Sequence, residues 1–349
     1  MRFSGISRVC GAPRRAVAAG LAALAVGAVV APAPAAAAPA TCQDVYLPVT
    51  LAGQQQTVFG HLCRPDRPTS TVLLLVPGAT YTAEYWDLPA SLGLFSFRGA
   101  LNDAGYATLA VDRLGSGRSS RPASALLTAI TQAGVLHQVV GRLRAEYPRV
   151  VIGGHSLGAT AVIVEAATFH DVDGVLVAGI VHHPDPVDDV ADFLTALYPA
   201  ALDPVLARRN YDPGYLTTAP GTRARAFHSP AQPSAAVAAY EESTKDAFAA
   251  PEAADGLGVG VVSPYTILID VPVLVALGGQ DELFCSPVPL VGTDCSSSAA
   301  LYAQEAPYYS PAARLRTYLL PGHYGHSFNF APNADLFAET VVQWAGHLS

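Results

Sequence analysis

Short apolar runs alternate with longer amphipathic segments along most of the chain. Six runs are mainly apolar, as expected of strands buried on both faces of a sheet. They cover residues 71–76, 106–111, 150–152, 174–181, 272–277 and 315–320. Helix-compatible segments lie between or after these runs, at 95–104, 123–147, 159–168 and 334–347. This alternation predicts an α/β fold with a mostly parallel central sheet and helices on both faces.

Two regions depart from the alternation. Near the start, runs at 45–51 and 57–62 flank a plausible turn at 52–54 and predict a hairpin. Residues 185–266 carry many prolines, with helical pieces near 187–198 and 235–248. An insertion of this kind between sheet strands is typical of a cap over the mouth of a site, so we expect about 185–266 to form a helical cap.

The first forty residues have the layout of a secretory signal. Four arginines precede an apolar run at 16–30, and small residues fill 31–40. Signal peptides are cleaved after small residues, which favours cleavage after Ala40. Sites one to three residues earlier satisfy the same rule almost as well. The apolar run is short for a stable membrane span, so an anchor is the weaker alternative. Arg14 and Arg15 leave a twin-arginine route open. We expect a secreted domain at 41–349.

Composition then limits the class of partner. Of 349 residues, 51% are hydrophobic and 14% are charged, which allows a large core. Loss of residues 1–40 removes four arginines and no acidic residue, so the net charge falls from −8 to −12. An acidic exported protein repels phosphates, which excludes nucleic acid as a partner. The sequence carries no signal for an oligomeric state.

The cysteines suggest disulfides. Cys10 leaves with the signal, and the even number that remains is typical of disulfide bonding in an exported chain. Of the three possible pairings, we favour Cys42–Cys63 and Cys285–Cys295, because each pair brackets a short segment. The spacings do not resemble those of zinc ligands.

Candidate chemistry begins at residues 154–158, which read Gly-His-Ser-Leu-Gly between a β-branched run and a helix-compatible segment. On so tight a strand-to-helix turn, small residues two before and two after the serine prevent steric clashes. The turn would raise the hydroxyl above the sheet, near the N-terminal amides of the new helix. We therefore expect Ser156 to be a nucleophile. The alternative is a glycine-rich turn without chemistry.

A carboxylate follows the next buried strand. Asp281 comes four residues after the run at 272–277, at the sheet edge where chemistry is expected in α/β folds. We expect Glu282, one residue further on, to be exposed to solvent instead. Asp185, after the run at 174–181, is a reserve candidate for the acid.

Two histidines follow the last strand. His326 lies between a glycine and a serine and is the favoured base, with His323 as its competitor. The adjacent His182 and His183 would point to opposite faces of a strand, which argues against a metal site there.

Ser156, Asp281 and His326 come in this order, each after a buried strand. The chain thus resembles the α/β-hydrolase superfamily, in particular secreted bacterial serine esterases and lipases of that fold. The resemblance covers about residue 45 to the C-terminus, apart from the cap. It rests on Pro77-Gly78-Ala79, the 154–158 motif, Gly279-Gln280-Asp281 and Gly325-His326. One departure is Pro77, where many members have histidine.

The resemblance implies a catalytic triad. His326 would take the proton of Ser156 and Asp281 would hold the histidine tautomer. The backbone amides of Ala79 and Leu157 would bind the oxyanion, with Thr80 replacing Ala79 if the turn is offset. No metal and no organic cofactor would be needed.

Three functions remain open at this point. The favoured one is hydrolysis of a small-molecule or lipid ester through an acyl-enzyme. A peptidase or amidase of the same fold would use the same triad. A non-catalytic binding protein on this scaffold is the third, and the presence of all three triad residue types argues against it.

Overall fold

The computed structural model describes residues 11, 40–185, 189–286 and 291–348. The expected signal lies outside these residues except for Gly11 and Ala40, so export and cleavage stay predictions. Within the described ranges, no helix has the length and apolar character needed to cross a membrane.

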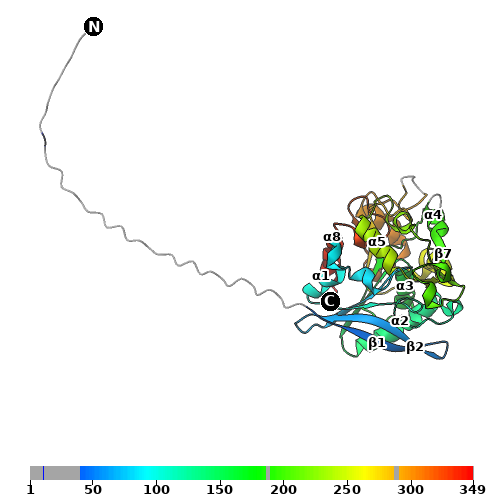
Figure 1. The fold of residues 1–349 in the computed structure, drawn as a ribbon. Helices are drawn as coiled ribbons and strands as arrows, with labels where there is room; N and C mark the ends of the chain where they lie inside the picture. The colour runs from blue at the N-terminus through cyan, green and yellow to red at the C-terminus, as the bar shows by residue number, and fades with distance from the viewer. Residues whose placement is uncertain (1–10, 12–39, 186–188, 287–290, 349) are drawn as a thin grey trace, which may run out of the picture. The chain divides into compact units, whose positions relative to one another are not determined.

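A central sheet of eight strands organises the described chain (Figure 1). Its strand order is β1-β2-β4-β3-β5-β6-β10-β11. Strand β2 pairs antiparallel with β1 and β4, and the other neighbours are parallel, which confirms the mostly parallel sheet. The strands are β1 (Thr41–Leu51), β2 (Gln54–Arg64), β3 (Thr71–Val76), β4 (Ala107–Val111), β5 (Arg149–His155), β6 (Gly174–Ala178), β10 (Val273–Gly278) and β11 (Arg316–Leu320).

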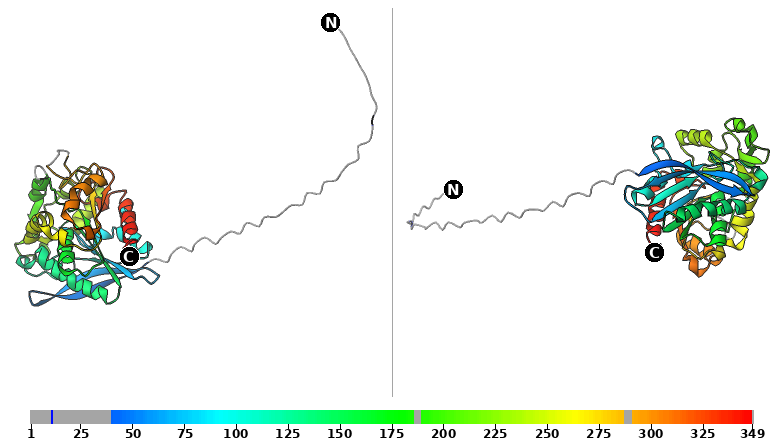
Figure 2. Two further views of the ribbon diagram at one scale, coloured as in Figure 1. Left: turned by 180° about the vertical axis from the view of Figure 1, so that it is seen from behind. Right: turned by 90° about the horizontal axis from the view of Figure 1, so that it is seen from below.

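Helices cover both faces of this sheet (Figure 2). Successive side chains of a strand point to opposite faces, so Leu74 joins one core cluster and Leu73 and Leu75 join the other. Helices α2 (Ala129–Arg144) and α3 (Leu157–Phe169) contribute to the first cluster. Helices α1 (Phe97–Asp103) and α8 (Asp335–Ala345) contribute to the second. A further helix, α7 (Ser298–Glu305), packs beside β11.

The segment between β6 and β10 is not purely helical. It contains three helices, α4 (Asp189–Ala196), α5 (Ala235–Thr244) and α6 (Ala250–Leu257). The first two lie within the helical pieces predicted near 187–198 and 235–248. It also contains a small antiparallel sheet that the sequence did not predict. Its strands are β7 (Leu197–Pro199), β8 (Tyr215–Thr218) and β9 (Phe248–Ala249). The role of this segment as a cap stays a prediction.

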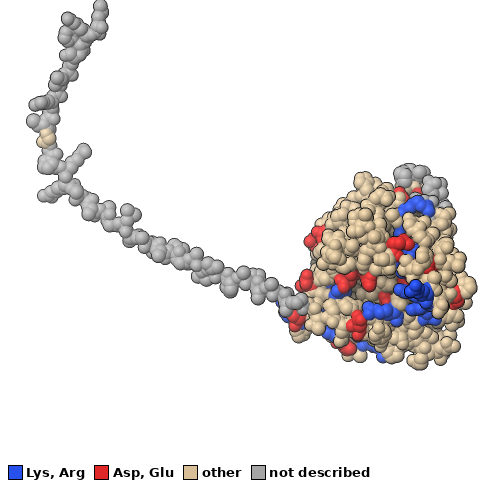
Figure 3. All heavy atoms as spheres, viewed as in Figure 1, with Lys and Arg blue, Asp and Glu red and all other residues tan. Residues whose placement is uncertain are grey.

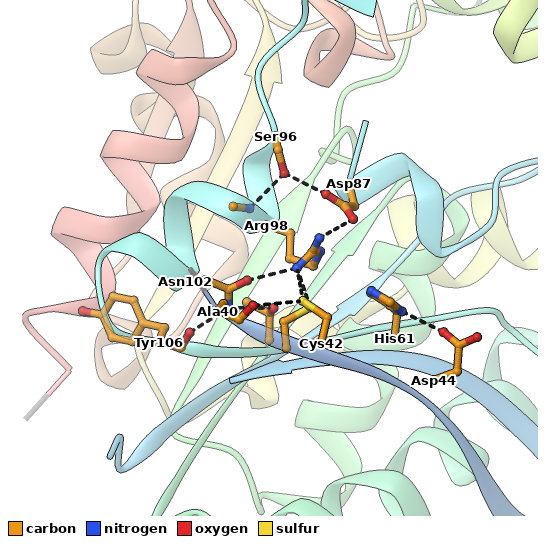
Figure 4. Close-up of a disulfide and its surroundings, with 12 residues drawn as sticks. Ala40, Cys42, Asp44, His61, Asp87, Ser96, Arg98, Asn102 and Tyr106 are labelled. Carbon is orange, nitrogen blue, oxygen red and sulfur yellow. Dashed lines mark hydrogen bonds and ion pairs between the residues drawn. A yellow bond between two sulfur atoms is a disulfide. The ribbon is translucent and has the colours of Figure 1, made fainter. Parts of the chain in front are cut away.

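Both expected cysteine pairs lie at disulfide distance. The Sγ–Sγ distance is 2.07 Å for Cys42–Cys63 and 2.01 Å for Cys285–Cys295. The first bridge joins β1 to β2 (Figure 4). There the guanidinium of Arg98, on α1, contacts both sulfurs and pairs with Asp87. The bridge therefore fixes the edge hairpin and lies against a helix on one face of the sheet.

A buried ion pair joins the inserted segment to the central sheet. Arg113, just after β4, pairs with Glu252 of α6, and both side chains are almost fully buried. Replacement of Glu252 by glutamine would leave a buried guanidinium without its counter-charge. We expect the free energy of unfolding to fall by about 3–5 kcal/mol, measured by urea denaturation.

The control is the exposed pair Arg64–Glu146, which has the same charges. The change Glu146→Gln should alter the free energy of unfolding by less than about 1 kcal/mol, because water screens this pair. Equal losses in the two variants would contradict the role of burial.

Candidate active site

The predicted site residues meet at one edge of the central sheet. Ser156 follows β5, Asp281 follows β10 and His326 follows β11. These strands run parallel, so their carboxyl ends share an edge, where ligands bind in open α/β sheets. The turn of residues 77–80 follows β3 at the same edge.

Ser156 lies on a strained turn between β5 and α3. Its backbone angles are φ 55° and ψ −125°, a positive φ that costs of order 1–3 kcal/mol for a residue with a side chain. A Cβ atom at Gly154 would lie 2.5 Å from the Ala159 nitrogen, and one at Gly158 would lie 2.5 Å from the Pro77 oxygen. Both flanking glycines are therefore required for the tight approach of the elbow to its neighbours.

His326 and Asp281 form a buried pair. Nδ1 of His326 lies 2.9 Å from Oδ2 of Asp281, and the two side chains are 3% and 0% exposed. The backbone amide of Leu283 donates a second hydrogen bond to the Asp281 carboxylate, at 3.1 Å. An ionised Asp281 thus requires the proton of His326 on Nδ1, which leaves Nε2 as the reactive nitrogen.

The competing residues lie elsewhere. His323 is exposed and its Nδ1 lies 2.7 Å from Gln280 Oε1. Asp185 is buried, and its backbone amide donates to the Leu283 oxygen. His182 is held by the carboxylate of Glu305 at 2.7 Å. The acid that the structure places at Nδ1 of His326 is therefore Asp281, the favoured candidate.

Ser156 and His326 line one cavity of about 80 Å³. Nε2 of His326 is buried and has no hydrogen-bond partner among the described residues. Most of the other lining residues are apolar and come from the sheet edge, α4, α6 and the loop after β10. They are Leu157, Ile180, Pro184, Phe193, Leu194, Ala253, Gly256, Val261, Leu283 and Phe284.

The two predicted oxyanion amides flank this serine. Leu157 is the first residue of α3, where a backbone N–H has no partner inside the helix. Neither this amide nor that of Ala79 donates a hydrogen bond to another described residue. A Cβ at Gly78 would lie 2.9 Å from the Cβ of Ser156, so only glycine lets the turn approach so closely. Arg113 donates to the Gly78 oxygen at 3.3 Å and holds the turn in the absence of a histidine at position 77.

His155 supports the histidine loop, a role that sequence reasoning missed. Its Nε2 donates to the backbone oxygen of His326 at 2.9 Å, and its ring stacks on Tyr85 with centroids 4.4 Å apart. Burial, together with the nearby His326, holds the pKa of His155 well below its usual range. A neutral His155 keeps the N–H that this bond requires, without adding positive charge beside His326.

A second buried network, also unforeseen, joins the inserted segment to two site loops. The hydroxyl of Tyr81, after β3, donates to Glu241 of α5 at 2.6 Å and lies 2.8 Å from Ser327 Oγ. Glu241 also contacts His228 and lies 3.6 Å from Arg223. Burial alone would raise the pKa of Glu241, but these two bases hold it below its usual value. The carboxylate therefore stays charged and holds the Tyr81 hydroxyl, which in turn contacts Ser327, the residue next to His326.

A family model described as "Alpha/beta hydrolase family" matches residues 73–342. This range includes the predicted catalytic and oxyanion residues and the Cys285–Cys295 pair, but not Cys42 or Cys63. The chain matches no curated protein.

Solved structures share the fold at low sequence identity. An enol-lactonase from Burkholderia xenovorans LB400 is 16% identical, with a TM-score of 0.58, over 86% of this chain and 100% of that one. A soluble variant of monoglyceride lipase from Saccharomyces cerevisiae is 16% identical, with a TM-score of 0.61, over 88% and 96%. A bromoperoxidase from Bacillus anthracis is 16% identical, with a TM-score of 0.57, over 86% and 100%. The different activities in these names show that the shared fold does not identify the substrate.

Proposed function

Because the chain belongs to the alpha/beta hydrolase family, we propose that it is an exported serine hydrolase that cleaves carboxylic esters. The observation that carries this proposal is the buried Asp281–His326 pair, whose histidine shares a cavity with Ser156. The leader pattern and the two disulfides support export.

The proposed reaction proceeds in two halves. Ser156 Oγ attacks the ester carbonyl while Nε2 of His326 takes its proton, and Asp281 stabilises the imidazolium. The amides of Ala79 and Leu157 bind the tetrahedral oxyanion, each contributing on the order of 3 kcal/mol. The imidazolium then protonates the leaving alcohol, and water hydrolyses the acyl-enzyme with the same histidine as base.

The cavity walls support an uncharged, apolar acyl group as substrate. No lysine, arginine or carboxylate side chain lines the described cavity next to Ser156. On the face seen in Figure 3, acidic and basic side chains lie among broad uncharged areas, in keeping with the 14% charged composition. A charged acyl chain would lose its hydration in the cavity without gaining a partner.

The proposal is tested with a panel of p-nitrophenyl esters of increasing acyl length, assayed beside aminoacyl anilides. We expect ester turnover with at most slow anilide turnover. A kcat/KM higher for the anilides would replace the proposal by an amidase or peptidase. Absence of turnover and of covalent labelling by a fluorophosphonate would favour a binding protein.

The length of the acyl group should depend on Ala253, which lines the cavity from α6. The change Ala253→Phe fills part of the cavity, so kcat/KM for long acyl chains should fall by about tenfold or more relative to acetate, since 1.4 kcal/mol of lost binding is tenfold. Ala254, the next residue of α6, is exposed. The control Ala254→Phe should leave the chain-length profile unchanged, and a matching shift in both variants would contradict this pocket assignment.

A further inference from the structure

A second cluster of chemically active side chains lies away from the proposed active site. Among the described residues, two groups bring together three or more potential metal ligands. One contains Cys42, His61 and Cys63, but its sulfurs are joined in a disulfide and supply no thiolate. The other contains His137 of α2, Glu165 of α3 and Asp171 of the loop before β6.

The second group contains carboxylate oxygens that the protein itself does not satisfy. Glu165 is 0% exposed, and no N–H group or hydroxyl of the described chain donates to its carboxylate oxygens, which face the carboxyl group of Asp171. Oδ1 of Asp171 is also buried and unpartnered, while its Oδ2 lies 2.7 Å from Nδ1 of His137. Buried polar groups are nearly always satisfied, so these three oxygens require an explanation.

We propose that His137, Glu165 and Asp171 bind a divalent transition-metal ion of the zinc class. One ligand atom from each of the three residues lies within 4.8 Å of the others. A tetrahedral zinc ion with ligands at 2.0–2.2 Å holds its ligand atoms about 3.3 Å apart, which small side-chain rotations would reach. A water molecule would be the fourth ligand.

The chemistry of the ligands sets the preference for one class of ion. An imidazole nitrogen with two carboxylates suits zinc and its neighbours, whereas calcium takes six to eight oxygen ligands. The side chain of His137 is 41% exposed, so an ion can reach the site from solvent. Its ring stacks on Phe169 with centroids 3.9 Å apart, which fixes its orientation.

The electrostatics of the cluster favour a bound cation. Burial, together with the neighbouring Asp171 carboxylate, raises the pKa of Glu165 to about 9, although Arg144 acts in the opposite direction. Arg144 pairs with Asp173 at 2.8 Å, so its charge is matched outside the cluster. A bound metal ion would supply the positive charge that the two facing carboxyl groups lack.

The test is calorimetric titration of the purified, chelator-treated protein with Zn²⁺ and with Ca²⁺. We expect one Zn²⁺ per chain and no binding of Ca²⁺. The isosteric change Glu165→Gln and the change His137→Gln, at a half-exposed position that leaves the core intact, should each weaken Zn²⁺ binding about 100-fold.

The control is His61→Gln, which removes another surface His–Asp pair of nearly the same geometry but without a third acid. This variant should bind Zn²⁺ like the wild type. Zinc should also raise the Tm of the wild type and not that of Glu165→Gln. No Zn²⁺ binding, or unchanged affinity in both ligand variants, would overturn the proposal and leave a protonated Glu165–Asp171 pair as the explanation.

Discussion

Replacement of Ser156 by alanine should reduce kcat for ester hydrolysis by on the order of 10⁶-fold, to the residual rate that the oxyanion amides provide. Alanine meets the same backbone strain at φ 55° as serine does, so the variant should fold about as stably as the wild type. Stopped assays with the best ester of the panel would measure the loss.

A control separates loss of chemistry from loss of fold. A fluorophosphonate probe should label the wild type at Ser156, identified by peptide mass mapping, and should not label the alanine variant. Ser91, an exposed serine, provides the matched substitution Ser91→Ala, which should keep wild-type turnover. Labelling of the alanine variant at another serine, with activity retained, would disprove the nucleophile assignment.

The second large effect distinguishes the two histidines that compete for the role of catalytic base. We expect His326→Ala to lower kcat by a factor similar to that of Ser156→Ala, because serine without its base is a weak nucleophile. His323→Ala should keep kcat close to the wild-type value, since that ring bonds Gln280 at the surface. The same ester assay compares the two variants, and circular dichroism checks that both are folded.

The acid should behave differently from the base. Asp281→Asn preserves the shape of the side chain but favours the wrong tautomer of His326, so kcat should fall by about 10⁴-fold. If His323→Ala abolished turnover while His326→Ala spared it, the base assignment would be reversed.

The strands could be predicted because their pattern is local. The run at 71–76 is apolar at nearly every position, and the structure has β3 at those residues. Asp281 and Ser156 stood out because each comes four residues after such a run. The helix at 123–147 was predicted too long at both ends, because a 3₁₀ turn at Ser124–Leu126 precedes α2, which ends at Arg144.

The supporting residues could not be predicted, because their partners are distant in sequence. His155 bonds the backbone of a residue 171 positions away, and Tyr81 bonds Glu241 across 160 positions. No periodicity encodes these pairs. The small sheet of the inserted segment was not predicted for a different reason. Its strands β7 and β9 have only three and two residues, too few to show an alternation of apolar and polar positions.

The buried charges of the inserted segment bear on how substrate enters. Glu241 accepts a hydrogen bond from Tyr81 of the loop after β3, and Tyr81 also contacts Ser327 of the loop after β11. Arg223 donates to Thr80, in the same loop after β3, at 2.7 Å. If this part of the segment swung away as a hinged flap, it would break these buried hydrogen bonds to charged groups, which costs about 1–3 kcal/mol for each group left unsatisfied. We therefore expect residues 203–246 to stay in place during turnover. Exchange of substrate and product would then depend on side chains at the cavity mouth, where Leu194 is half exposed.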